Sequence, residues 1–149
     1  MDVFLLCLLV HIIGLTLAAG TTVISFMVSQ RFGKFYVEDK ARAIPLMELG
    51  NRFPRLTGIG IGLLLLSGVF MIMLSKGAFA GQLWLRIKIV LVLIVIANGF
   101  VGKSLSKRVK AIVASEGSIK SLHQKVTTFY LVQLFLFLAI FVLGVFKFD

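Results

Sequence analysis

A long stretch at the start of the chain, from Val3 to Val28, contains no Lys, Arg, Asp or Glu. About 20 apolar residues cross a bilayer, so this stretch predicts a membrane span. Three more apolar runs follow, and 59% of all residues are hydrophobic. We therefore predict an all-α integral membrane protein that forms one transmembrane domain, residues 1–149, folded as a four-helix bundle. The helices are expected over about residues 3–30, 55–75, 83–114 and 119–147.

Basic residues are distributed unevenly between the three connections. The connections 30–55 and 103–125 each hold six Lys or Arg residues, whereas 76–82 holds only Lys76. Cytoplasmic loops are rich in Lys and Arg, which predicts that the two basic connections are cytoplasmic and that both termini lie outside, in the periplasm. We expect a multi-pass protein of the bacterial inner (cytoplasmic) membrane. The formal charge of +10 then favours anionic lipid headgroups as partners, and no nucleic acid is expected.

The connections carry two local signals. Pro45 lacks an amide N–H and suits the start of a short helix, whereas Gly50 and Asn51 favour an irregular loop, so both interpretations stay open. Residues 77–81 are rich in Gly and Ala and predict a tight turn.

His11 is the one ionisable side chain deep in the first span. An ionisable residue inside a span is a candidate functional residue. Small and hydroxylic residues follow at spacings of three and four, which places them on the same helix face. They are Gly14, Ala18, Thr21, Thr22, Ser25 and Ser29. We expect this stripe to face the inside of the bundle.

Three polar residues of other spans are expected to meet His11 in one cavity. Lys88 lies about five residues into the third span, at a depth similar to that of His11, and it is expected to turn inward while Arg86 reaches the interface. Asn98 and Gln133 lie nearer mid-membrane. A bundle can hold a porphyrin between facing helices, and an imidazole is a good ligand for haem iron.

Two functions stay open from these residues. In the first, the protein binds haem b or a porphyrin, with His11 as the iron ligand, Lys88 pairing with a propionate and Asn98 or a water on the second axial position. In the second, the protein is a non-enzymatic small transporter or assembly partner, and the same polar residues are interhelical contacts. Gly58 and Gly62 form a small-xxx-small pair in the second span, from which we expect close helix contact and a homodimer.

The segment Leu9–Gly14 resembles the first helix of HemJ-type protoporphyrinogen oxidases and of the related CopD-like small membrane proteins. Asn51–Arg55, which includes Arg52, is similar to their arginine-rich entry to the second helix, and Trp84–Val92 is similar to their third helix. The resemblance implies that His11, Lys88 and Arg52 bind haem b or a porphyrin. The family has a later His in its third helix, where this chain has Asn98, so we expect a divergent member.

Overall fold

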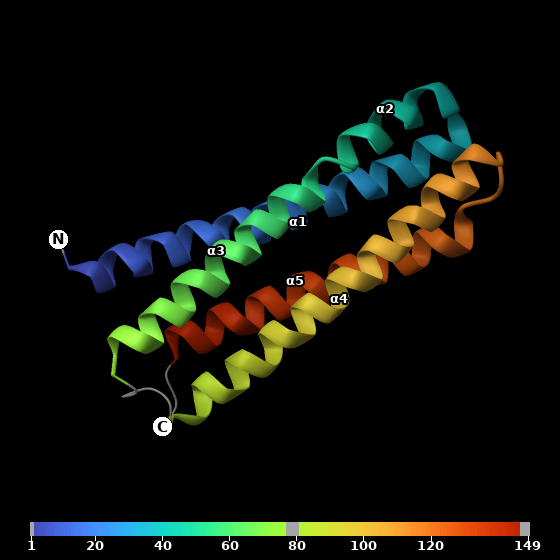
Figure 1. Ribbon diagram of the computed structural model, residues 1–149. Coiled ribbons are helices and arrows are strands. Elements are labelled where there is room, and N and C mark those ends of the chain that lie inside the picture. Colours follow the sequence, from blue (N-terminus) through green and yellow to red (C-terminus); the bar gives the residue numbers. More distant parts are fainter. Residues whose placement is uncertain (1, 77–80, 147–149) are drawn as a thin grey trace.

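The computed structural model describes residues 2–76 and 81–146, and this part of the chain contains helices and no strands (Figure 1). The helices are α1 (Val3–Glu38), α2 (Lys40–Gly50), α3 (Phe53–Leu74), α4 (Leu83–Ala114) and α5 (Lys120–Val145). The described chain has four helices long and apolar enough to cross a membrane, which confirms the predicted multi-pass helical protein. The tight turn predicted at 77–81 and the predicted end of the last helix at 147 fall on residues 77–80 and 147–149, outside the described residues.

The four long helices form an open ring. α1 packs against α3 on one side and against α5 on the other, and α4 packs against α5. In the described residues, no Cα atom of α3 lies within 8 Å of a Cα atom of α4. The ring order is therefore α3, α1, α5 and α4, and the side between α4 and α3 has no backbone contact.

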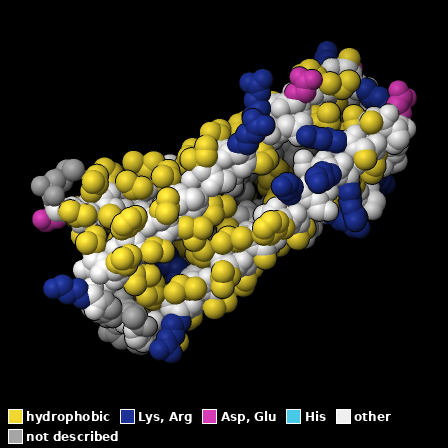
Figure 2. Space-filling model, viewed as in Figure 1, with side chains coloured by type: hydrophobic (Ala, Val, Ile, Leu, Met, Phe, Trp, Pro, Cys, Tyr) yellow, Lys and Arg dark blue, Asp and Glu magenta, His cyan; other side chains and the backbone are white. Residues whose placement is uncertain are grey.

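The two ends of the bundle differ in charge. The start of α1 and the end of α5 lie at one end, which we call the terminal end (Figure 1). The opposite end, which we call the basic end, consists of α2 and the adjoining ends of α1, α4 and α5. Lys and Arg side chains gather over the basic end in Figure 2, as expected when both basic connections lie on one side of the membrane.

The first connection is helical and not an irregular loop. α1 continues to Glu38, beyond the end expected near residue 30, because its buried face continues through Phe32 and Tyr36. α2 begins at Lys40 and not at Pro45, since the Asp39 side chain caps it by accepting from the amide of Ala41. Pro45 lies inside this helix. A small core holds the basic end together; its buried members are Phe32, Tyr36, Ala43 and Ile119.

Glycine brings the backbones of α1 and α3 into contact. A Cβ atom added at Gly60 would lie 2.7 Å from the amide nitrogen of Ala18 and 2.8 Å from the carbonyl oxygen of Gly14. Both distances are shorter than real Cβ contacts, so this crossing requires glycine at position 60. The prediction that Gly58 and Gly62 make the close contact is wrong within the chain, because a Cβ atom at either would meet nothing within 4 Å. These two glycines lie on the opposite side of α3 from Gly60.

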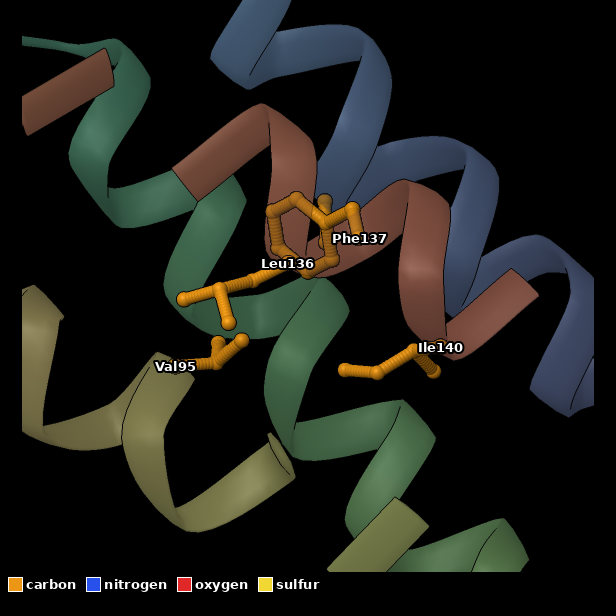
Figure 3. Close-up of a cluster of buried hydrophobic side chains, with 5 residues drawn as sticks. Val95, Leu136, Phe137 and Ile140 are labelled. Atoms are coloured by element: carbon orange, nitrogen blue, oxygen red, sulfur yellow. The ribbon is translucent and has the colours of Figure 1, made fainter. Parts of the chain in front are cut away.

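An apolar layer fills the centre of the bundle (Figure 3). Its buried side chains are Ala18 from α1, Val95 from α4, and Leu136, Phe137 and Ile140 from α5. Ile61 and Leu64 of α3 pack against the same cluster, so side chains join the two helices whose backbones stay apart. The lipid-facing surface is also apolar, which is expected because hydrocarbon replaces water as the solvent there.

The glycine crossing gives a testable difference between neighbouring glycines. We expect Gly60→Ala to lower the free energy of unfolding by about 1–3 kcal/mol, because the new methyl group meets backbone atoms that cannot move aside cheaply. Gly58→Ala and Gly62→Ala are the matched controls and should leave stability unchanged or raise it by up to about 1 kcal/mol. Reversible unfolding in mixed micelles measures all three. Equal losses at the three positions would contradict the assigned crossing.

Candidate functional site

His11 is anchored to α3 near the terminal end. Its Nδ1 atom lies 2.9 Å from the Ser67 hydroxyl oxygen, and its ring packs against Gly68. The Ser67 hydroxyl donates to the backbone carbonyl of Leu63 at 2.6 Å, so it accepts from the imidazole N–H. The carbonyl of Leu64, 3.3 Å from the same hydroxyl, is a further acceptor for the ring.

This anchoring fixes the tautomer of the ring. A neutral imidazole has one N–H, and a ring that donates from Nδ1 carries its lone pair on Nε2. Histidines that bind metals are commonly held in the same way, with one nitrogen bonded to a neighbouring acceptor and the other directed to the metal. The lone pair of the neutral His11 ring is therefore at Nε2.

Lys88 reaches the same level of the bundle from α4. Its ammonium nitrogen lies 3.6 Å from the Cβ position of Gly144 on α5, and its positive charge acts on the His11 ring. The side chain is half-buried, whereas Arg86 is exposed, as expected from the sequence. In Figure 2 a basic side chain is visible in a recess between α3 and α4, surrounded by hydrophobic side chains.

All four long helices thus contribute to one polar layer, which we call the His11 layer. Its members are His11, Ser67, Gly68, Lys88 and Gly144. Trp84, one turn before Lys88 on α4, is buried on the side of the terminal end. The structure therefore brings His11 and Lys88 to the same level, where the imidazole packs on Gly68 and the ammonium on Gly144.

Asn98 belongs to a second polar layer. Its amide nitrogen donates to the Gln133 side-chain oxygen at 2.6 Å, and Gln133 is only 3% exposed. Asn98 lies ten residues beyond Lys88 on α4, or about 15 Å along the axis at 1.5 Å per residue. The apolar layer around Val95 separates the two polar layers. The structure therefore does not bring Asn98 and Gln133 into one cavity with His11.

Arg52 also lies apart from the His11 layer. It is exposed and precedes α3 at the basic end, fifteen residues before Ser67, which is about 22 Å along the helix. His123, the second histidine, lies at the same end, where its ring covers Gly33 of α1 so closely that a Cβ there would clash with it. Along α1, Gly33 is about 33 Å from His11.

Most of the stripe expected to face inward on α1 is buried, which confirms that prediction. Gly14, Ala18, Thr21, Thr22 and Ser25 are all buried. The hydroxyls of Thr22 and Ser25 donate to backbone carbonyls one turn earlier, so they are satisfied within their own helix. Thr21 also reaches Thr57 of α3 at 2.8 Å.

Ser67 is the functional neighbour that the sequence alone does not identify. A serine bonded to its own helix backbone is common in membrane spans and gives no specific signal. The one usable signal was the dipeptide of Ser67 and Gly68, a polar and a small residue in the terminal half of an otherwise aliphatic span. Its pairing with His11 depends on the register set by the glycine crossing.

The described residues contain no group of three or more His, Cys, Asp or Glu side chains suited to hold a metal ion. What the His11 layer offers instead is one imidazole lone pair beside one cation. Comparison with protein-family models, with characterised proteins and with solved structures finds no match for this chain.

The coupling free energy between the two side chains of the second polar layer can be measured. We expect a double-mutant cycle on Asn98→Ala and Gln133→Ala to give a coupling of about 0.6–1.7 kcal/mol, the range for hydrogen bonds between membrane helices. Thr16→Ala replaces Asn98→Ala in the control cycle, because the Thr16 hydroxyl bonds only to Ile12 of its own helix and faces outward. Coupling as large in the control cycle would show that the bond is not specific.

Proposed function

We propose that this chain is a haem b- or porphyrin-binding redox protein of the bacterial cytoplasmic membrane and a divergent relative of the HemJ-type and CopD-like proteins. The observation that carries the proposal is the His11 imidazole, whose Nδ1 is anchored on α3 by Ser67 and whose Nε2 holds the lone pair. In this function His11 is the iron ligand, and Lys88 attracts a carboxylate of the ligand.

The donor set of the His11 layer fits a singly ligated haem or a metal-free porphyrin. His11 supplies one neutral nitrogen, and no other imidazole of the described chain lies near it, since His123 is at the basic end. Asn98 is used by Gln133 and lies too far along α4 to be a second ligand. A bound haem would supply one-electron redox chemistry. Ser67 then holds the imidazole in one tautomer and orientation.

The small side chains around His11 support a ligand that enters between helices. Gly68 on α3 and Gly144 on α5 carry no side chain toward the ring and the ammonium, and α3 and α4 make no backbone contact beside them. A planar, largely apolar molecule with carboxylates matches an apolar bundle that holds the Lys88 ammonium at the level of His11. The apolar layer below keeps water from reaching the site from the other side.

An absorption spectrum of the detergent-purified protein, oxidised and then reduced with dithionite, tests the proposal. With haem supplied, we expect a Soret band and reduced α and β bands. His11→Ala should abolish these bands, because it removes the nitrogen ligand. Lys88→Gln should weaken haem binding about tenfold while leaving the band positions of the bound form unchanged, since it removes a charge and no ligand.

His123→Ala is the matched control, because it removes the other histidine at the far end of the bundle and should leave the spectrum as it is. Gel filtration shows whether each variant remains folded and monodisperse. A protein that stays colourless with haem supplied, or a spectrum unchanged in His11→Ala, would overturn the proposal.

A second candidate function rests on the hydrogen bonds between helices. Besides the bond of His11 with Ser67, side-chain hydrogen bonds between helices join Thr21 with Thr57, Gln30 with Thr127, and Asn98 with Gln133. In the described residues no buried side-chain nitrogen or oxygen lacks a partner. A non-enzymatic transporter or assembly partner would use its polar residues in this way. A folded protein that binds neither haem nor porphyrin would favour this function.

The proposed orientation places the basic end in the cytoplasm. Ser118 is exposed at that end, so we expect a Ser118→Cys variant, made in a Cys7→Ala background, to resist a membrane-impermeant maleimide in intact cells. It should react once the membrane is opened. An Asp2→Cys variant in the same background, with its new thiol at the terminal end, is the control and should react in intact cells. The reverse pattern would contradict the orientation.

A further inference from the structure

A groove runs along the outside of α4 and α5, from the basic end into the membrane-spanning region. It consists of two adjoining cavities of about 330 Å³ and 530 Å³, which share Ser121 and Lys125. We call it the α4–α5 groove. It is separate from the His11 layer, and none of the residues assigned to that layer lines it.

The mouth of the groove is cationic and hydroxylic. Arg108 from α4 and Lys125 from α5 face it, with Ser118 and Ser121 beside them. Neither Arg108 nor Lys125 takes part in the two ion pairs of the described chain, which are Lys40 with Glu116 and Arg42 with Asp39. The one acidic residue of this connection, Glu116, is thus directed to α2. Two positive charges and two hydroxyls suit a phosphate group.

The inner part of the groove is mostly apolar, although Gln124 and Thr128 also line it. Leu105, which is 9% exposed, and the more open Val101 and Val132 line it. The tip of the Phe129 ring lies against Gly102, where a Cβ atom would clash with it, and Phe129 forms a wall of the groove. The groove ends at Asn98, ten residues before Arg108, which is about 15 Å along α4. That length equals half of the ~30 Å hydrocarbon core, or one leaflet.

From this arrangement we infer that the α4–α5 groove binds one anionic phospholipid of the leaflet at the basic end. Its phosphate lies between Arg108 and Lys125, and one acyl chain lies in the inner part of the groove, toward Asn98. The two cations belong to the charged connection, whereas Val101 and Val132 belong to apolar spans. A phospholipid likewise has a charged headgroup at the membrane surface and an acyl chain in the apolar interior, so it matches both parts of the groove. Basic pockets between helices at the cytoplasmic face bind lipid headgroups in this manner.

The full chain, stripped of lipid in a neutral detergent, is titrated with phosphatidylglycerol and followed by native mass spectrometry. Phosphatidylcholine with the same acyl chains and glycerol phosphate are titrated in parallel. We expect saturable binding of one phosphatidylglycerol per chain. Each of the single variants Arg108→Gln and Lys125→Gln should weaken it about fivefold, and the pair about 30-fold. The pair Lys107→Gln and Lys110→Gln removes the same charge from exposed positions that do not line the groove, and should change binding less than twofold.

The inner part of the groove is tested separately from the two cations at its mouth. Val101→Trp fills the apolar part and should weaken phosphatidylglycerol binding at least tenfold, whereas Val90→Trp, on an exposed part of α4 outside the groove, should not. Equal binding of phosphatidylcholine, or equal loss in the Lys107 and Lys110 pair, would overturn the inference in favour of unspecific attraction. Equal affinity for glycerol phosphate would overturn it in favour of a phosphate site. Because the groove lies away from His11, these results do not depend on the haem spectrum.

Discussion

The contact of backbones at Gly14, Ala18 and Gly60 determines the rest of this structure. Between membrane helices there is no hydrophobic driving force, because lipid tails are as apolar as leucine, so close packing and interhelical hydrogen bonds must hold the pair together. The crossing fixes the antiparallel register of α1 and α3. That register places Thr21 opposite Thr57 on one side of the crossing, and His11 opposite Ser67 on the other. The anchored imidazole is therefore a consequence of where three small residues meet.

The polar side chains of the bundle are arranged in layers. The His11 layer lies toward the terminal end, the pair of Asn98 and Gln133 lies beyond the apolar layer, and Gln30 with Thr127 follows toward the basic end. Each layer joins side chains of different helices. In hydrocarbon an unpaired polar group is costly, so each pairing opposes a slip of one helix along another. The layers thus add specificity to a fold whose apolar residues are largely interchangeable.

Much of the fold, and less of the site, could be predicted from the sequence. The four spans follow from uninterrupted apolar runs, and the inward stripe of α1 follows from the spacing of Gly14, Ala18 and Thr22. The pair Gly58 and Gly62 predicts a contact on the side of α3 opposite to the one that packs on α1, because a small-xxx-small pattern does not identify the helix that it contacts. Because a span is equally apolar on all sides, hydropathy does not determine how the helix is rotated about its own axis. The contact of Gly60 became visible only with the partner helix in place.

The relative depth of polar residues on different helices is also hard to predict from the sequence. Asn98 and Gln133 pair with one another, but ten residues of α4 separate Asn98 from the level of Lys88. A count of residues from the membrane surface is accurate to about a turn for one helix, and the errors add when four helices are compared. α1 also extends beyond the predicted end near residue 30, because Phe32 and Tyr36 continue the buried face beyond the charge of Arg31.

The apolar layer of Val95, Leu136, Phe137 and Ile140 has an electrical consequence. A dry layer is where most of a transmembrane voltage falls, and moving one charge across 100 mV changes its energy by about 2.3 kcal/mol. The imidazole of His11 and the ammonium of Lys88 both lie on one side of this insulator. In the proposed function, protons or electrons exchanged there with the aqueous phase at the terminal end would not cross this layer. Redox chemistry at His11, as proposed, would therefore respond less to the membrane potential than the same chemistry within or beyond the apolar layer.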